Sequence, residues 1–212
     1  MAYLKTLLVI AISTINWLYS LPVSASDYGT TGLVDIPTAR METDGVLTAT
    51  SAIQSRTNSY AISYQPTPWL ETTFRYTGFN RFFYYDRNYE AKLRLWSERE
   101  YLPQVAVGIR DMVGTGVFGS EYVVGSKRFG NTDVTLGVGW GRLAGDGIFS
   151  NPLREIDNRF SVRSSASGVD TGQFSVGNLF SGAKVGVFGG VSHIFEEAPL
   201  MAMFEYNPDK YD

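Results

Sequence analysis

The chain contains no cysteine and only one histidine, and charged residues make up just 18% of it. Without cysteine it can form no disulfide, no thiolate metal site and no cysteine-linked lipid anchor. A single histidine excludes a His-rich metal site. The 18 basic residues are outnumbered by 21 acidic ones, which gives a net charge of −3 and no electrostatic reason to expect nucleic-acid binding. We therefore expect no cofactor, no metal and no nucleic-acid partner.

The first 25 residues have the features of an export signal. Lys5 precedes an apolar stretch, and Pro22 breaks the helix. The small residues that a signal peptidase requires follow, and cleavage is predicted after Ala25. An uncleaved membrane anchor is the rival interpretation, but Ser13 and Asn16 interrupt an apolar run that would need about 20 residues to cross a bilayer. The remaining residues, 26–212, fit a single domain.

Short segments beyond the leader alternate between apolar and polar residues, which is typical of β-strands. In residues 70–77, one face would carry Leu70, Thr72, Phe74 and Tyr76, and the other Glu71, Thr73, Arg75 and Thr77. Aromatic residues are abundant, and mean hydropathy is close to zero at −0.08. Membrane barrels share this profile because only every second residue must be apolar.

The pattern predicts about nine antiparallel strands, which fits an all-β outer-membrane barrel or a partial barrel of about 8–10 strands. The strands are expected at residues 45–54, 58–65, 70–77, 90–97, 104–111, 121–129, 133–143, 184–194 and 200–206. Pro66–Pro68 is expected to form a tight connection, and residues 130–132 the clearest hairpin turn. Residues 144–182 are predicted to form a long loop with a short helix near residues 153–158.

Three motifs suggest enzymes or cofactor sites but fail on context. Residues 114–119 have the glycine spacing of a dinucleotide-binding turn, yet a strand is expected to follow, where that chemistry requires a helix. His193 has no recognisable triad partners and is interpreted as a residue near a strand end. The adjacent Glu196 and Glu197 are interpreted as loop residues, because glycoside hydrolysis needs two facing carboxylates. We therefore expect a protein that is not an enzyme.

Strand parity assigns two groups of side chains to opposite faces of the expected barrel. The candidate lumen-facing polar residues are Glu71, Arg75, Glu90, Lys92, Arg94 and Arg110. Arg or Lys facing mid-bilayer lipid costs about 2–4 kcal/mol, so these side chains are expected to line a lumen and contact polar glycan. The candidate membrane-girdle aromatics are Tyr60, Tyr64, Trp69, Tyr76 and Trp140. Residues 82–85 (FFYY) suggest either loop packing or a platform for sugar rings.

Several segments resemble the YjbH-like outer-membrane proteins. Residues 29–41 (GTTGLVDIPTARM) are similar to the opening motif of that family, and residues 110–122 (RDMVGTGVFGSEY) to a second signature. Further similarity lies in residues 126–130, 135–143, 188–191 and 204–206. The resemblance implies an outer-membrane barrel that serves exopolysaccharide or capsule production or export, with no known catalytic residues. Family members are generally much longer, so it also implies the N-terminal portion of such a protein.

The sequence thus predicts a non-enzymatic outer-membrane barrel of a Gram-negative bacterium, exported through a cleaved signal peptide. Its expected partners are outer-membrane lipid, exopolysaccharide and other exopolysaccharide-secretion proteins. A soluble periplasmic β-sandwich that binds carbohydrate remains an alternative, because sandwich strands also have one apolar face. An outer-membrane enzyme acting on lipid or glycan is a third interpretation, based on His193 and the scattered carboxylates.

Overall fold

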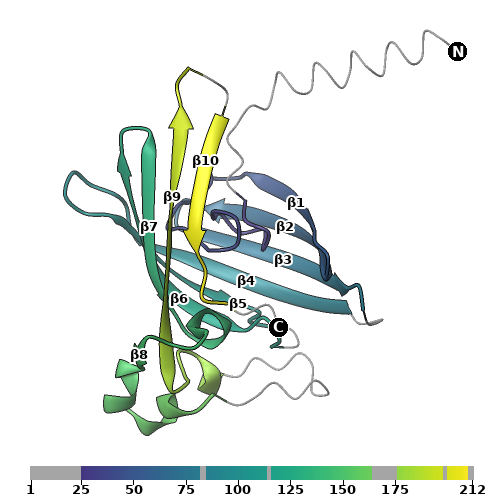
Figure 1. The fold of residues 1–212 in the computed structure, drawn as a ribbon, viewed down its shortest axis with the longest axis vertical. Coiled ribbons are helices and arrows are strands. Elements are labelled where there is room, and N and C mark those ends of the chain that lie inside the picture. Colours follow the sequence, from purple (N-terminus) through teal and green to yellow (C-terminus); the bar gives the residue numbers. More distant parts are fainter. Residues whose placement is uncertain (1–24, 82–84, 114–115, 164–175, 198–199, 210–212) are drawn as a thin grey trace, which may run out of the picture.

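The computed structural model describes residues 25–81, 85–113, 116–163, 176–197 and 200–209, which form one antiparallel sheet (Figure 1). Nine strands follow chain order across the sheet, and a two-residue strand, β8, pairs with β9 beside that path. The strands are β1 (Leu47–Ile53), β2 (Thr57–Thr67), β3 (Leu70–Phe79), β4 (Tyr85–Trp96), β5 (Gln104–Arg110), β6 (Ser120–Phe129), β7 (Thr132–Gly139), β8 (Phe149–Ser150), β9 (Lys184–Phe195) and β10 (Leu200–Tyr206). The predicted all-β antiparallel class is confirmed, but the sheet is not closed: β1 and β10 are its edges in the described chain.

Most strand boundaries agree with the alternation in the sequence, and the differences have local causes. The predicted hairpin between β6 and β7 forms, and Gly130 takes the positive φ (57°) that its tight turn requires. The prediction of a connection at Pro66–Pro68 is wrong for Pro66 and Thr67, because β2 continues through Thr67 with a shift in register after Tyr64. β4 begins at Tyr85, earlier than the predicted residue 90.

In its described residues, the long connection between β7 and β9 holds β8 and four short 3₁₀ helices. These are η1 (Gly141–Ala144), η2 (Pro152–Glu155), η3 (Asn158–Ser161) and η4 (Val176–Asn178). The predicted helix near residues 153–158 is therefore present as two separate turns. None of the helices in the described ranges is long and apolar enough to cross a membrane. The predicted signal peptide lies outside the described residues, apart from Ala25.

The sheet curls around residues 25–46, which we call the inner segment (Figure 1). This irregular segment contacts strands on both sides of the curl: Glu71 of β3 accepts a hydrogen bond from the Thr31 amide, and Glu205 of β10 accepts hydrogen bonds from the amides of Val34 and Asp35. The face of the sheet that contacts the inner segment is called the concave face, and the opposite face is called the convex face.

A small apolar core lies between the inner segment and the second half of the sheet. It comprises Leu33, Ile36, Ala39, Ala106, Tyr122, Val124, Leu143 and Phe188. The rings of Tyr122 and Phe188 meet edge to face, with centroids 6.3 Å apart. A Cβ atom at Gly108 would collide with the Tyr122 ring, and one at Gly137 with the Phe188 ring. Glycine on the neighbouring strands therefore makes room for these two aromatic side chains.

The two ends of the sheet differ in the length of their connections. At one end, two-residue turns join β2 to β3 and β6 to β7, and residues 97–103 join β4 to β5. At the other end lie the short β1–β2 turn (residues 54–56), the β3–β4 and β5–β6 loops and the long β7–β9 connection, whose β8 lies in the lower part of Figure 1. We call these the short-turn end and the long-loop end. The distinction matters because bacterial membrane barrels have short periplasmic turns and longer extracellular loops.

Candidate functional site

Charged side chains are buried on the concave face, where a soluble sheet would bury apolar ones. Of the predicted polar group, the structure buries Glu71, Arg75, Glu90, Lys92 and Arg110 on this face and leaves Arg94 half-buried. Their strand parity is thus as expected. Whether they line a lumen in the assembled protein stays a prediction.

An ion pair anchors the inner segment to the middle of this face. Lys92 Nζ lies 2.5 Å from Glu71 Oε2, and the two residues are direct neighbours in the register of β3 and β4. Thr31 lies between them in the hydrogen-bond pattern: its amide donates to Glu71 Oε1 at 2.6 Å, and its carbonyl accepts from Lys92 Nζ at 3.1 Å. Both charges therefore bind backbone groups of the inner segment and attach it to the sheet.

Arg75 and Arg110 share a single buried carboxylate. Each guanidinium Nε lies 3.8 Å from a different oxygen of Glu90. Arg75 is also held between two aromatic rings, with its Cζ 4.2 Å from the Tyr28 centroid and 4.3 Å from that of Phe118. Arg110 lies 3.9 Å from the same Tyr28 ring. Stacking on rings is a usual way to hold a desolvated guanidinium.

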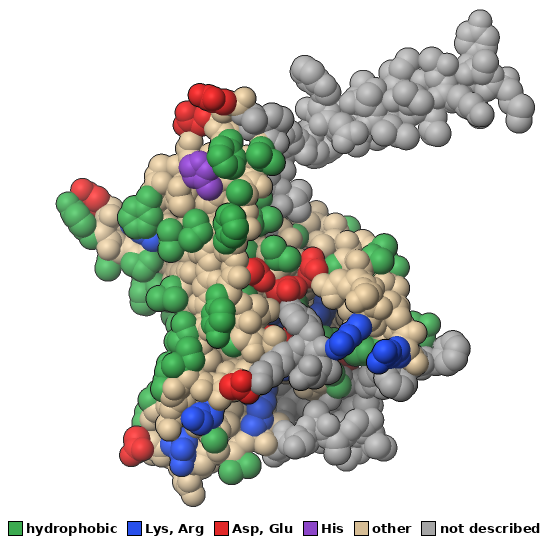
Figure 2. All heavy atoms as spheres, in the orientation of Figure 1, with side chains coloured by type: hydrophobic (Ala, Val, Ile, Leu, Met, Phe, Trp, Pro, Cys, Tyr) green, Lys and Arg blue, Asp and Glu red, His purple; other side chains and the backbone are tan. Residues whose placement is uncertain are grey.

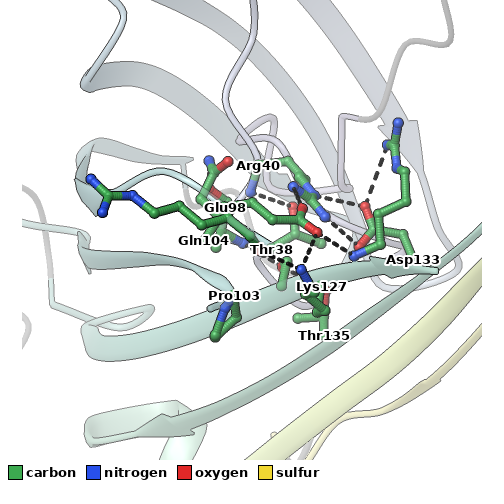
Figure 3. Close-up of polar contacts among 12 residues, drawn as sticks. Thr38, Arg40, Glu98, Pro103, Gln104, Lys127, Asp133 and Thr135 are labelled. Carbon is green, nitrogen blue, oxygen red and sulfur yellow. Dashed lines mark hydrogen bonds and ion pairs between the residues drawn. The ribbon is translucent and has the colours of Figure 1, made fainter. Parts of the chain in front are cut away.

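At the short-turn end, Arg40 of the inner segment contacts β7 and the connection between β4 and β5 (Figure 3). Its guanidinium makes a two-point contact with Asp133 at 2.7 and 2.9 Å, and its Nη1 lies 2.6 Å from Glu98. Burial alone would raise the pKa of Glu98, but hydrogen bonds from the Arg128 amide, Arg40 and Lys127 lower that pKa to about 2. No sequence pattern marks this cluster, because its members come from separate segments.

A cavity of about 1210 Å³ opens on the concave side at the long-loop end. Each connection at this end contributes a lining residue, and strands β1 to β3 and the inner segment contribute the others. Its side chains are rich in arginine and aromatic groups: Arg56, Arg75, Arg81 and Arg142, with Tyr28, Phe79 and Phe118. Most of the basic side chains visible in Figure 2 lie in its lower half, toward this end. Of these residues, only Arg75 was predicted from the sequence as a candidate site residue.

Asp111 fixes the loop that carries Phe118. It follows β5 directly, has a positive φ of 55°, and accepts a hydrogen bond from the Phe118 amide at 3.0 Å. Burial and the nearby Asp86 carboxylate raise the pKa of Asp111 to about 6, although the Phe118 amide and Arg75 oppose the shift. A raised pKa means that folding favours the protonated form of this carboxyl group.

We expect Asp111 to make the protein less stable as pH rises. Its contribution is fully present below the unfolded pKa of about 3.9 and is lost as pH rises through about 6, with a size on the order of 1–3 kcal/mol. Urea unfolding followed between pH 4 and 7.5 should show this loss. Asp111→Asn should remove most of it, whereas Asp44→Asn, at an exposed turn, should leave it in place. Equal pH dependence in all three proteins would contradict the assignment.

The predicted girdle aromatics lie on the convex face, with one difference. Tyr60, Tyr64 and Trp69 are exposed, and Tyr76 is half-buried beside its cross-strand partner Tyr60. Trp140 is instead buried, at 6% exposure, with its ring edge-on to Phe180 at 5.1 Å. The long connection folds back over this end of the convex face, and so it covers Trp140.

The remaining motifs show no catalytic arrangement in the described residues. His193 lies near the end of β9, where its Nδ1 is 2.8 Å from the Thr132 hydroxyl and its ring is edge-on to Phe195. The glycine motif at residues 114–119 lies partly outside the described ranges, and the strand β6 begins directly after it. Within those ranges, no three His, Asp or Glu side chains gather closely enough to hold a metal ion.

Comparison with known proteins identifies the family. The model of the YjbH family, described as exopolysaccharide biosynthesis protein YbjH, matches residues 24–212. A curated protein of Escherichia coli (strain K12), "Uncharacterized lipoprotein YjbH", is 39% identical over 225 aligned residues, which cover 99% of this chain and 32% of that protein. The chain thus spans about a third of that relative. No solved structure shows a significant match. The resemblance seen in the sequence is confirmed: the chain belongs to the YjbH family of exopolysaccharide biosynthesis proteins.

Proposed function

We propose that this sheet forms part of the wall of an outer-membrane β-barrel, and that the protein serves exopolysaccharide production or passage without catalysing a reaction. The observation that carries the proposal is the inverted polarity of the sheet. Its concave face buries ions and amides, while its convex face exposes large apolar side chains, including Leu47, Ile62, Leu93, Leu136 and Phe204. Lipid covers such a face in a barrel wall.

The few charged residues on the convex face lie near the ends of the strands. Arg87 lies at the long-loop end beside Tyr76, its cross-strand partner. Lys127 lies at the short-turn end, where it pairs with Glu98. Glu121 is buried under the long connection and forms a two-point ion pair with Arg163. The middle of the convex face is left without charge, as a bilayer core requires.

A soluble sandwich would bury this convex face against a second sheet. The described chain has one principal sheet. The apolar side chains on its convex face are exposed: 64% of Leu136 and 76% of Phe204. The edge strands β1 and β10 also need partners, because a bilayer cannot satisfy their free backbone groups. In the proposed barrel, further strands pair with both edges, and the long-loop end faces outward from the cell.

Membrane fractionation tests the location. Expressed with its leader in a Gram-negative host, the chain should sediment with the outer membrane and stay there through a high-salt and alkaline carbonate wash, because the apolar convex face is buried in lipid. A soluble periplasmic protein measured in the same samples serves as the control. Recovery of the chain as a compact, monodisperse monomer in buffer without detergent would contradict the barrel.

A deletion tests the role. Removing the gene from its host should lower the amount of secreted polysaccharide, and the intact chain supplied on a plasmid should restore it. The proposal of a non-enzymatic role adds a further expectation: His193→Ala should restore secretion as well as the unchanged chain does. Failure of that variant at normal protein levels would instead favour a catalytic role.

A further inference from the structure

The cavity at the long-loop end has a buried cationic group with unused hydrogen-bonding capacity. Arg75 is 2% exposed, yet in the described chain its Nη2 atom has no hydrogen-bond acceptor. Its Nε donates to Asn88 at 3.3 Å, and it shares the Glu90 carboxylate with Arg110. A buried N–H donor that makes no hydrogen bond costs free energy, which indicates that a bound ligand supplies the acceptor.

We propose that this cavity binds a sugar residue that carries a carboxylate group, as part of an acidic polysaccharide. The inference rests on the proposed function, since it names the class of polysaccharide that the protein handles. The planar guanidinium of arginine matches a carboxylate in two-point geometry, and the cavity presents four arginines against two aspartates, Asp27 and Asp35.

Several carboxylates of the protein near this cavity already have hydrogen-bond or ion-pair partners. Asp27 accepts a hydrogen bond from Gln54 at 2.7 Å. Asp209 binds Arg142 through both oxygens, at 2.9 and 3.0 Å. Glu90 is shared between two guanidinium groups. Arg75 in the wall and Arg81 at the exposed rim are therefore the groups that would meet an anionic ligand in the cavity.

Aromatic walls make the cavity suited to a sugar ring more than to a free ion. Phe79 and Phe118 stack with centroids 5.9 Å apart, and Tyr28 meets Phe118 edge-on at 6.2 Å. Ligand sites commonly combine apolar and aromatic walls with a few convergent polar groups. The volume of about 1210 Å³ exceeds what a single small anion requires and accommodates a short stretch of glycan.

The test uses the purified full chain in detergent micelles and isothermal titration calorimetry with trigalacturonate, a trisaccharide with one carboxylate per sugar. Binding is expected, with an affinity that falls as salt is raised. Arg81→Ala and Arg56→Ala, at the rim, should each weaken it by about tenfold, because a hydrogen bond to a charged group contributes roughly that much. Arg75→Gln should abolish it. The rim variants keep the test decisive if the buried substitution prevents folding.

The matched controls are an arginine outside the cavity and a neutral ligand. Arg159→Ala, on exposed η3, should bind trigalacturonate as the unchanged protein does. Maltotriose should bind at least about tenfold more weakly, because it offers no carboxylate. Equal binding of maltotriose, inorganic phosphate binding as tightly as the trisaccharide, or full affinity in both rim variants would each overturn the proposal. These results are independent of membrane location, so they are distinguishable from a failed fractionation.

Discussion

Lys92→Met is expected to destabilise the folded protein by about 3–5 kcal/mol, because it leaves the Glu71 carboxylate buried without its counter-charge. Lys92 is fully buried and Glu71 is 2% exposed, so water cannot take over the missing interaction. The substitution also removes the hydrogen bond from Lys92 to the Thr31 carbonyl, which holds the inner segment against β4. The loss is larger than that expected from an exposed ion pair, whose removal costs about 1 kcal/mol or less.

Chemical unfolding of the refolded protein in detergent, followed by tryptophan fluorescence, measures this loss. Lys184→Met makes the same substitution at an exposed lysine at the start of β9 and should change stability by about 0.5 kcal/mol or less. The double variant Glu71→Met with Lys92→Met should be more stable than Lys92→Met alone, since it buries no unpaired charge. If Lys92→Met unfolds at the same denaturant concentration as Lys184→Met, the ion pair does not anchor the inner segment.

The alternation of residues predicted most of the sheet because strand parity is a local property. Its main failure, at the start of β4, is explained by polar residues on the concave face. In residues 85–90, the concave face carries the buried polar Asp86 and Asn88, and Arg87 interrupts the apolar character of the convex face between Tyr85 and Tyr89. The strand was therefore predicted to start too late. At the end of β7, Gly141 takes a positive φ of 64° and η1 begins, which ends the strand before the predicted residue 143.

The alternation of residues along each strand also predicted which charged side chains lie on the concave face, but it did not predict which of them form ion pairs. The pairing of Glu71 with Lys92 depends on the register of β3 against β4, which single strands do not specify. The contacts of the inner segment were beyond prediction for a different reason. Thr31 uses its backbone N–H and C=O, and every residue carries these groups, so no side-chain pattern marks them.

The arginine-lined cavity was missed because its parts come from all the connections at one end of the sheet. Tyr28 and Phe118 are separated by 90 positions in the chain, yet they hold Arg75 between them. A glycine-rich loop gave the strongest sequence signal in this region, and it was correctly interpreted as a connection between strands. The side chains of such loops come together only because the sheet curls, and this curvature depends on the whole fold.

Leu136→Arg is expected to block membrane insertion if lipid covers the convex face. Leu136 is 64% exposed in the middle of β7, and its two cross-strand neighbours, Gly125 and Gly189, have no side chains to cover it. In water, an arginine here would be tolerated like any surface substitution. At mid-bilayer it costs about 2–4 kcal/mol. The same change thus opposes insertion of a barrel and has little effect on a soluble protein.

Insertion into phospholipid vesicles, measured as the fraction of protein that floats with them in a density gradient, distinguishes the two. Leu136→Arg should reduce the equilibrium between inserted and free protein by at least about thirtyfold, as the lower end of that cost requires. Ile156→Arg is the matched control, because Ile156 is 77% exposed but lies on the long connection after η2. It should insert like the unchanged chain. Equal insertion of both variants would show that lipid does not contact the outer surface of β7.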